Sequence, residues 1–307
     1  MTATDAATGA GASGRVFVTG GTGFVGTNLR AALGDRPVRL LVRNKAAMQA
    51  RVGADVELVE GDVTRAETLK GAMDGCHAVV HLVAVIAEEG GVTFDGVIRQ
   101  GTINTVEEAK RSGVRRFLHM SAMGTRHDPH FGYFEAKWQA EQAVVESGIP
   151  WTIFRPSVIF GPGDEFITTL AQLVKLAPVI PVVGSGKSKF QPVSVGEVVQ
   201  AFVRALDDPA TAGNIYELGG GKVYDYEQML DVIAAKLGKK KPKVHVPVGL
   251  MMPVVTLSKS LPKALRPPVT SEQLKMLAVD NCSDASATAD LIGRPAMRLE
   301  DGIDYIR

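Results

Sequence analysis

A glycine-rich segment near the start of the chain most constrains its fold. Residues 16–26 read Val-Phe-Val-Thr-Gly-Gly-Thr-Gly-Phe-Val-Gly, an apolar run typical of a buried strand that passes through a turn into a helix expected at Thr27–Leu33. Of its glycines, Gly20, Gly23 and Gly26 match three separate needs: a tight turn, close approach of the backbone to a pyrophosphate, and close packing of helix against strand. The segment predicts a dinucleotide site at the helix N-terminus. A purely structural turn is the alternative.

Composition excludes some classes of partner and site. Of the 307 residues, 45% are hydrophobic and 22% are charged, as in ordinary globular enzymes, and the formal net charge is +1. A charge so close to neutral argues against nucleic-acid binding. The two cysteines, Cys76 and Cys282, fit no metal-binding spacing. We therefore expect no metal site, and the scarcity of cysteine favours a reducing compartment.

No segment has the pattern of a membrane span. Residues 1–14 are mostly Ala, Thr, Gly and Ser, which predicts a disordered tail without a secretory pattern. No apolar run is long enough to cross a bilayer, so we expect a cytoplasmic protein. The apolar run 244–257 is interrupted by prolines. Its Leu250, Met251 and Met252 could meet a partner or the inner face of a membrane, or could pack in an ordinary core.

Strand and helix patterns alternate through the first half of the chain. Apolar strands are expected at residues 16–19, 37–43, 56–63, 78–84, 116–121 and 151–156, with helices between them. This alternation predicts a Rossmann-type α/β fold, a doubly wound parallel sheet, over residues 15–160. Residues 161–307 predict a smaller mixed α/β C-terminal lobe for the substrate, some of whose strands could return to the main sheet. Two capping-box spacings, Ser194 to Glu197 and Thr270 to Gln273, predict helix starts within this lobe.

The end of the second strand bears on the choice of cofactor. Dinucleotide folds that accept NAD place an acidic residue here to bind the ribose 2′-hydroxyl, whereas an arginine suits the 2′-phosphate of NADP. No acid lies between Leu40 and Asn44, and Arg43 stands at the strand end. The sequence therefore favours NADP(H) over NAD(H). A solvated arginine is the alternative.

The ends of the third and fourth strands predict further cofactor contacts. Asp62 could accept from the adenine amino group, or could cap a helix expected near residues 66–73. The small residues Val83 and Ala84 would line the path of the cofactor. His81 is interpreted as a core or cleft-edge histidine. Asn104, in the middle of an expected helix, could bond to a neighbouring loop or simply face solvent.

Three polar residues near the fifth strand could carry proton-transfer chemistry. Ser121 ends the strand, and Tyr133 and Lys137 lie four residues apart on the next helix, so they share one face. A lysine ammonium near a phenol lowers its pKa from about 10, which lets the tyrosine exchange a proton with a carbonyl or alcohol. The serine can bond the same oxygen. An ordinary helix with a tyrosine and a surface lysine is the alternative.

Together these motifs resemble the extended and atypical short-chain dehydrogenase/reductase superfamily, which includes NAD-dependent epimerases and dehydratases. The matching residues are the glycine turn, Gly61-Asp62-Val63, Ser121, Tyr133 with Lys137, and Arg155-Pro156 followed by Gly161-Pro162-Gly163. More narrowly, residues 115–121, 136–141 and 154–164 are similar to the branch that contains the NADPH-binding accessory subunit of respiratory complex I and its bacterial relatives.

The resemblance implies a bound nicotinamide dinucleotide and an active pair formed by Tyr133 and Lys137, assisted by Ser121. The residues expected to hold the cofactor are Gly20, Thr22, Gly23, Phe24, Val25, Gly26, Arg43, Asp62, Val63, Leu82, Val83, Ala84, Lys137 and Pro156.

Two functions follow as hypotheses. The first is an NADPH-dependent oxidoreductase acting on a small or lipophilic carbonyl or quinone-type substrate. The second, implied by the narrower branch, is a non-catalytic NADPH-binding accessory or assembly subunit of a larger, quinone-linked respiratory complex.

Overall fold

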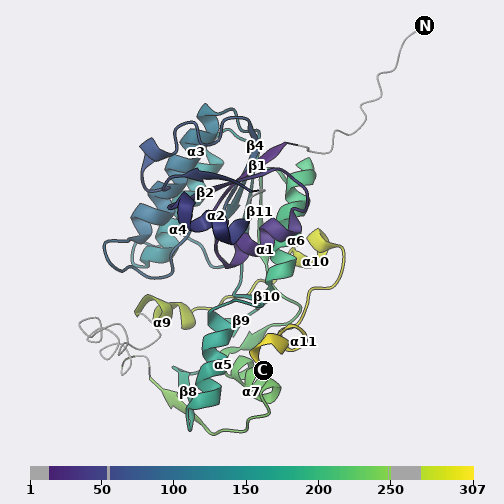
Figure 1. Cartoon of the computed structure of the whole chain (residues 1–307). Coiled ribbons are helices and arrows are strands. Elements are labelled where there is room, and N and C mark those ends of the chain that lie inside the picture. The colour runs from purple at the N-terminus through teal and green to yellow at the C-terminus, as the bar shows by residue number, and fades with distance from the viewer. Residues whose placement is uncertain (1–13, 54–55, 248, 250–270) are drawn as a thin grey trace.

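The computed structural model describes residues 14–53, 56–247, 249 and 271–307 and has a seven-stranded parallel sheet at its centre (Figure 1). The strand order is β11-β6-β5-β4-β1-β2-β3. From β1 the chain adds β2 and β3 on one side, and then β4, β5, β6 and β11 on the other, so the topological switch point lies between β1 and β4. The strands are β1 Arg15–Thr19, β2 Val38–Val42, β3 Glu57–Glu60, β4 Cys76–His81, β5 Arg116–Met120, β6 Trp151–Pro156 and β11 Asn214–Leu218. The predicted doubly wound sheet is confirmed. Most of the expected tail and of the apolar run 244–257 lies outside the described residues.

Alternating side chains of β1 divide the core into two layers. Val16 and Val18 face the cluster formed with α1 (Phe24–Ala32) and α6 (Val195–Asp207), whereas Phe17 faces the opposite cluster. On that second side lie α3 (Gly101–Arg111) and α4 (Gly132–Val145), as Figure 1 shows. Since side chains alternate along a strand, an apolar strand such as β1 can bury both of its faces under helices.

The remaining elements of the sheet half connect these layers. They are α2 Lys45–Val52, η1 Ala66–Thr68, the π-helical turn η2 Asp95–Gln100 that leads into α3, and η3 Pro209–Thr211.

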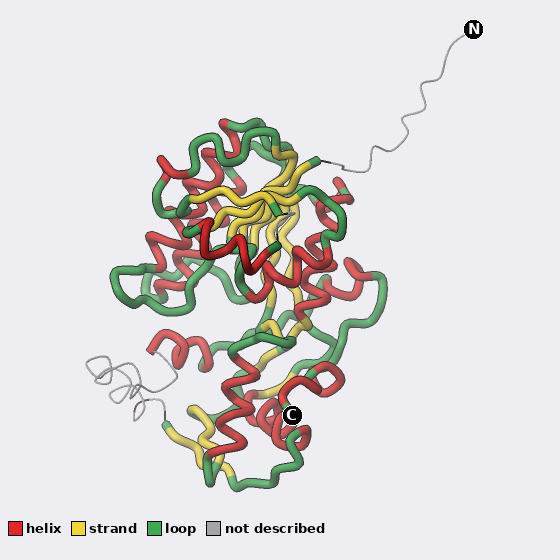
Figure 2. Tube along the Cα trace, in the orientation of Figure 1, coloured by secondary structure: helices red, strands yellow, loops and turns green. Residues whose placement is uncertain are grey.

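A second cluster of buried apolar residues forms a smaller lobe below the sheet (Figure 2). The helices of residues 166–176 (α5) and 226–236 (α7) form most of this core and contribute Ile167, Leu170, Leu230 and Ile233 to it. The strand of residues 180–183 (β8) pairs in parallel with that of residues 243–246 (β13). The elements of the chain outside the sheet half are β7 Ile159–Phe160, α5 Phe166–Leu176, β8 Ile180–Val183, β9 Lys189–Phe190, β10 Val193–Ser194, β12 Tyr224–Asp225, α7 Tyr226–Lys236, β13 Lys243–Val246, α9 Ser271–Leu277, α11 Leu299–Gly302 and η5 Asp304–Ile306. The short helix α10 (Thr288–Ile292) packs on α6 and so belongs with the sheet half.

The chain returns from this lobe to the sheet. Helix α6 packs on α1, and β11 pairs in parallel with β6, with Tyr216 opposite Phe154. Residues 161–307 are therefore divided between the small lobe and the sheet.

Several expected helix starts differ from the structure. The first helix begins at Phe24, three residues before the expected Thr27, because Gly23 is its N-cap. The expected helix at 66–73 is the short 3₁₀ turn η1.

The expected capping box of α6 is absent. Ser194 is the N-cap of α6, but its side chain makes no capping bond. The Glu197 carboxylate instead accepts hydrogen bonds at 2.8 Å from the guanidinium of Arg294 and from the backbone N–H of Met297. A capping box does open α7, where Asp225 and Gln228 bond each other's backbone N–H groups. Thr270, of the other expected box, lies outside the described residues.

Candidate functional site

The glycine turn has the three mechanical features expected of it. Gly20 has φ of +72°, a conformation that L side chains rarely adopt. An added Cβ at Gly26 would lie 2.2 Å from the carbonyl oxygen of Gly20, so only glycine lets α1 approach the turn. Gly23 is exposed, and a Cβ there would meet nothing closer than 3.4 Å. The fold itself therefore does not require glycine at position 23, and its predicted role in pyrophosphate binding stays a prediction.

The neighbours of this turn come from the switch point between β1 and β4. An added Cβ on Gly20 would lie 3.1–3.2 Å from the backbone of Leu82 and Val83, which follow β4. Thr22 is exposed, Val25 is buried, and the Phe24 ring lies against the glycines of the 161–163 turn. Ligands of doubly wound sheets bind at this kind of switch point. The glycine turn and the residues after β4 that are predicted to contact the cofactor thus lie together at this switch point.

Arg43 follows β2 and is exposed, and no ion pair involves it among the described residues. The next residue, Asn44, caps α2 by accepting from the N–H of Ala47 at 2.9 Å. A carboxylate does reach this loop from β3, where Glu60 accepts from the backbone N–H of Lys45 at 2.9 Å. The arginine side chain is therefore free to meet a phosphate.

Asp62 bonds a near neighbour in the chain and does not cap the following helix, while its predicted contact with the adenine stays a prediction. Its Oδ1 accepts from the backbone N–H and the hydroxyl of Thr64 at 2.9 and 2.8 Å, so it forms a local turn. The expected capping role is wrong, since the N-cap of η1 is Arg65. The next residue, Val63, is buried, and its carbonyl oxygen accepts from the Asn104 side chain at 2.8 Å. Of the two alternatives for Asn104, a bond to a neighbouring loop or exposure to solvent, the structure shows the bond.

The three predicted catalytic residues lie near the C-terminal ends of β4 and β5. Lys137 donates from Nζ to the carbonyl oxygen of Met120, the residue before Ser121, at 2.9 Å. Ser121 is buried and its hydroxyl is hydrogen-bonded to that of Thr125 at 3.1 Å. Tyr133 packs in a cluster that includes Ala84 and Ala122, which follow the ends of β4 and β5. Their assignment as catalytic residues stays a prediction.

Burial dominates the electrostatics of this group. Tyr133 is 6% exposed, and loss of solvent raises its pKa to about 12. Lys137 is 1% exposed, and burial lowers its pKa to about 8. The expected lowering of the phenol pKa by the lysine is therefore not what the structure shows, because desolvation disfavours the charged form of both groups. At neutral pH the tyrosine is a neutral phenol, able to donate a proton.

Beneath this group two buried histidines stack, with ring centroids 5.4 Å apart. His81 is hydrogen-bonded to the hydroxyls of Thr19 at 2.7 Å and Thr102 at 3.1 Å, which agrees with its interpretation as a core histidine. His119, which pairs with it across β4 and β5, has no partner for either ring nitrogen within the described part of the chain. Burial lowers the pKa of His81 to about 3 and that of His119 well below its usual value.

The last predicted contact, Pro156, ends β6 and is buried. Its carbonyl oxygen accepts from the backbone N–H of Met123 at 2.9 Å.

Two residues that hold the site together were missed by the sequence reasoning. Asn281 bonds Ser157 at the end of β6, and its backbone N–H donates to Lys189 of the small lobe at 2.7 Å. Glu141, on α4, is fully buried and binds Arg155 of β6. Glu141 could have been predicted to face the sheet, because it lies four residues after Lys137 on the same helix. The partners of Asn281 could not, because they lie about 90 and 120 residues earlier in the chain and no local pattern indicates them.

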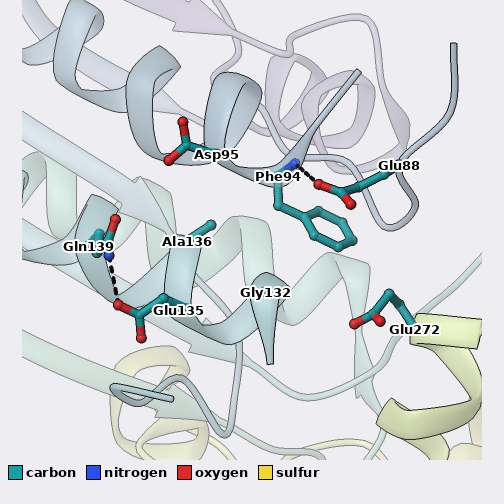
Figure 3. A pocket seen from close by; sticks show the side chains of 8 residues that line it. All are labelled: Glu88, Phe94, Asp95, Gly132, Glu135, Ala136, Gln139 and Glu272. Carbon is teal, nitrogen blue, oxygen red and sulfur yellow. Dashed lines mark hydrogen bonds between the residues drawn. The ribbon is translucent and has the colours of Figure 1, made fainter. Parts of the chain in front are cut away.

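A cavity of about 380 Å³ opens beside α4 (Figure 3). It is lined by Glu88, Phe94, Asp95, Gly132, Glu135, Ala136, Gln139 and Glu272. Glu88 accepts from the backbone N–H of Phe94 at 2.9 Å, and Glu135 accepts from Gln139 at 2.7 Å. The cavity borders the helix beside Tyr133 without including the predicted catalytic side chains.

Two absences apply to the residues that the structure describes. No helix there is long and apolar enough to cross a membrane. In the same residues no three His, Cys, Asp or Glu side chains are grouped so as to hold a metal ion.

Known proteins resemble this chain over most of its length. A subunit of mitochondrial NADH dehydrogenase from Arabidopsis thaliana, alpha subcomplex subunit 9, is 25% identical over 92% of this chain and 72% of its own length. A 4-hydroxy-2-methyl-3-oxo-4-farnesyl-3,4-dihydroquinoline-1-oxide ketoreductase from Stigmatella aurantiaca is 27% identical over 85% of each chain.

Among solved structures, the NADPH-dependent quinone oxidoreductase QOR2 of Escherichia coli, complexed with NADPH, shares the fold. It superimposes with a TM-score of 0.74 over 95% of this chain and 99% of its own, at 19% identity. The family model described as "NAD(P)H-binding" matches residues 20–209, more than half of the chain, starting at the first glycine of the turn. This protein therefore belongs to the NAD(P)H-binding family, in the superfamily of short-chain dehydrogenase/reductase-like and epimerase/dehydratase-like proteins.

Proposed function

We propose that this protein is an NADPH-dependent oxidoreductase that reduces a small or lipophilic carbonyl or quinone-type substrate. The placement of Tyr133 and Lys137 on one face of α4, beside Ser121 at the end of β5, carries the proposal. This placement puts a proton donor, a cation and a second hydroxyl at the edge of the sheet where ligands of this fold bind. The relatives named as a ketoreductase and a quinone oxidoreductase support the substrate class.

Each side chain has a role that follows from its surroundings. Tyr133 carries its proton at physiological pH, as a phenol with a pKa of about 10 or above does, so it is the group that can protonate the substrate oxygen. Burial raises its pKa to about 12, which by itself weakens it as an acid. The Ser121 hydroxyl can bond the same oxygen as charge develops on it. The Lys137 ammonium has three N–H donors and uses one on Met120, which leaves two for ribose hydroxyls. A bound nicotinamide would supply the hydride.

The preference for NADPH rests on Arg43. Its exposed guanidinium follows β2, where a planar fork of donors can bind a 2′-phosphate through two bonds. Glu60 is held at the neighbouring backbone N–H of Lys45 and does not pair with Arg43.

The test is a single substitution, Tyr133→Phe, which removes the acid and keeps the ring in its apolar cluster. With NADPH or NADH as donor and a panel of quinones, aldehydes and ketones, we expect turnover of the best substrate to fall by at least about 100-fold. NADPH binding, followed by cofactor fluorescence, should remain. Tyr226→Phe is the matched control, because Tyr226 is also buried but lies in the small lobe. Equal turnover by wild type and Tyr133→Phe would refute the mechanism.

The second candidate is a non-catalytic NADPH-binding subunit of a quinone-linked respiratory assembly. The similarity over 92% of this chain to a subunit of mitochondrial NADH dehydrogenase favours it. Under this proposal wild-type protein binds NADPH and is stabilised by it. It oxidises the cofactor with no member of the substrate panel, and it co-purifies with membrane-bound NADH dehydrogenase.

A further inference from the structure

A line of charged and polar groups runs along the buried face of α4. Tyr133, Lys137 and Glu141 follow one another at intervals of four residues, so their side chains lie on the same side of the helix. Lys137 is 1% exposed and Glu141 is fully buried. Charged side chains on a helix surface are normally exposed to solvent, whereas these two are buried and face the sheet.

Arg155 fixes the carboxylate of Glu141. Its Nε and Nη2 donate to the two carboxylate oxygens at 2.9 and 2.6 Å, which is a bidentate pair. Arg155 lies on β6, the strand beside β5, which Ser121 follows. The negative charge of Glu141 therefore has a fixed position one helical turn from Lys137.

The surroundings of Lys137 otherwise disfavour its charge. Within the described residues its ammonium makes no direct ion pair and donates only to the Met120 carbonyl. Burial lowers the pKa of Lys137 to about 8, and the Glu141 carboxylate acts in the opposite direction. From the strands, His81 and His119 face the lysine as neutral rings.

The other charged neighbour from the sheet is Arg155, a cation whose charge is taken up by Glu141, and Tyr133 on α4 itself is neutral. Glu141 is thus the one acid among the named groups around the lysine.

Building on the proposed reductase function, we propose that Glu141 is a positioning residue that, fixed by Arg155, keeps Lys137 a cation where the reaction occurs. A buried ion pair is by itself a weak source of stability, because desolvation offsets the attraction. The placement of this pair is explained by its effect on the lysine. The ammonium of Lys137 is the form with three N–H donors, and so the form that can donate to ribose hydroxyls while it holds the Met120 carbonyl.

The experiment reads the charge of Lys137 directly. Protein carrying ¹³C,¹⁵N-labelled lysine is titrated by NMR, and the Lys137 signal is assigned by its loss in Lys137→Arg. In Glu141→Gln we expect the titration midpoint of Lys137 to fall by about one pH unit. The alkaline limb of the pH–kcat profile of the reductase should move in the same direction. Glu146→Gln, an exposed acid at the end of α4, is the matched control and should move neither.

A second variant separates this effect from folding. Glu141→Gln leaves Arg155 buried without its partner, which destabilises the protein whatever the role of Glu141. The double variant Glu141→Met with Arg155→Met removes both charges and restores apolar packing, so its thermal stability should recover. The Lys137 midpoint should still lie below that of wild type in the double variant.

An unchanged Lys137 midpoint in both variants would overturn the positioning role, even if the enzyme is active. A wild-type protein that turns over no substrate would instead contradict the proposed function, while the NMR titration would still decide the role of Glu141.

Discussion

At the scale of single residues, His119 is the least satisfied group in the described core. It is fully buried, stacks on His81, and has no partner for either ring nitrogen among the described residues. A buried polar group without a hydrogen bond lowers stability by about 1–3 kcal/mol. Its burial also couples folding to pH, because an imidazole that must stay neutral in the folded state gains a proton on unfolding.

The pH dependence has a definite sign. The folded-state pKa of His81 is about 3 and that of His119 is also lowered, against a usual value of 6.5. Above pH 6.5 neither state binds the proton, so these residues cause no change in stability there. Below it the unfolded state binds more protons, and each histidine lowers the free energy of unfolding by about 1.4 kcal/mol per pH unit.

We therefore expect His119→Leu to raise the urea midpoint at pH 7 and to make the loss of stability between pH 6.5 and 5 shallower. Urea unfolding at half-unit pH steps measures both effects. His130→Leu, at an exposed position, is the control and should leave the slope unchanged. A slope as steep in His119→Leu as in wild type would contradict the account.

At the scale of elements, the turn from β1 into α1 contains two glycines with different reasons to be glycine. An added Cβ at Gly26 would collide with the turn, 2.2 Å from the Gly20 carbonyl oxygen and 2.5 Å from Gly21 Cα. At Gly23 the same Cβ meets only an ordinary contact at 3.4 Å, and the backbone has φ −79°, which any residue adopts.

The same substitution should then have opposite effects at the two positions. Gly26→Ala should lower the melting temperature markedly, because α1 must move away from the turn. Gly23→Ala should leave the melting temperature of cofactor-free protein within about a degree of wild type and weaken NADPH binding by at least about 10-fold, since the methyl group occupies the phosphate side. Thermal unfolding with and without NADPH separates the two. Equal loss of stability in both variants would refute this division.

The elements of the sheet could be predicted because their signals are local. β1 and β4 are short apolar runs next to glycine turns, and the helix that carries Tyr133 and Lys137, α4, was expected between β5 and β6, where it lies. Helix starts were less accurate, since Ser194 and Glu197 fit a capping box in sequence while Glu197 turns to Arg294. That partner lies far along the chain, and residue spacing carries no information about it.

In the candidate site, too, the features with a local sequence signal could be predicted and those set by distant segments could not. The glycines, Arg43 and the Tyr133–Lys137 spacing could be found from motifs. The raised pKa of Tyr133 could not, because it arises from packing against Phe94, Ala84 and Ala122 of other segments. Motifs locate groups, and burial decides their protonation state.

At the scale of the whole molecule, Asn281 joins the small lobe to the sheet. Its side-chain oxygen accepts from Ser157 Oγ at 2.5 Å and from the N–H of Val158 at 3.1 Å. Its backbone bonds Lys189 and Gln191 at 2.7 and 3.1 Å. The hydrogen bonds of this one residue therefore link the end of β6, in the sheet, to the segment 189–191 of the small lobe.

We expect Asn281→Ala to lower the free energy of unfolding by about 1–3 kcal/mol, since it leaves the N–H of Val158 and the Ser157 hydroxyl without this partner. Scanning calorimetry should show that the transition of the small lobe moves to lower temperature ahead of the sheet. Asn214→Ala, whose side chain bonds only nearby carbonyls, is the control. A single unshifted transition would show that the connection contributes nothing.

The late position of β11 in the chain has a consequence for biosynthesis. This strand covers the edge of β6, yet it consists of residues 214–218, whereas β6 is complete at Pro156. For the several seconds in which the ribosome makes the intervening residues, β6 presents an unpaired row of backbone groups. That edge carries Ile153 and Phe154, both fully buried in the finished protein. The nascent chain is thus most open to strand-to-strand aggregation in this interval, and chaperone demand should peak there.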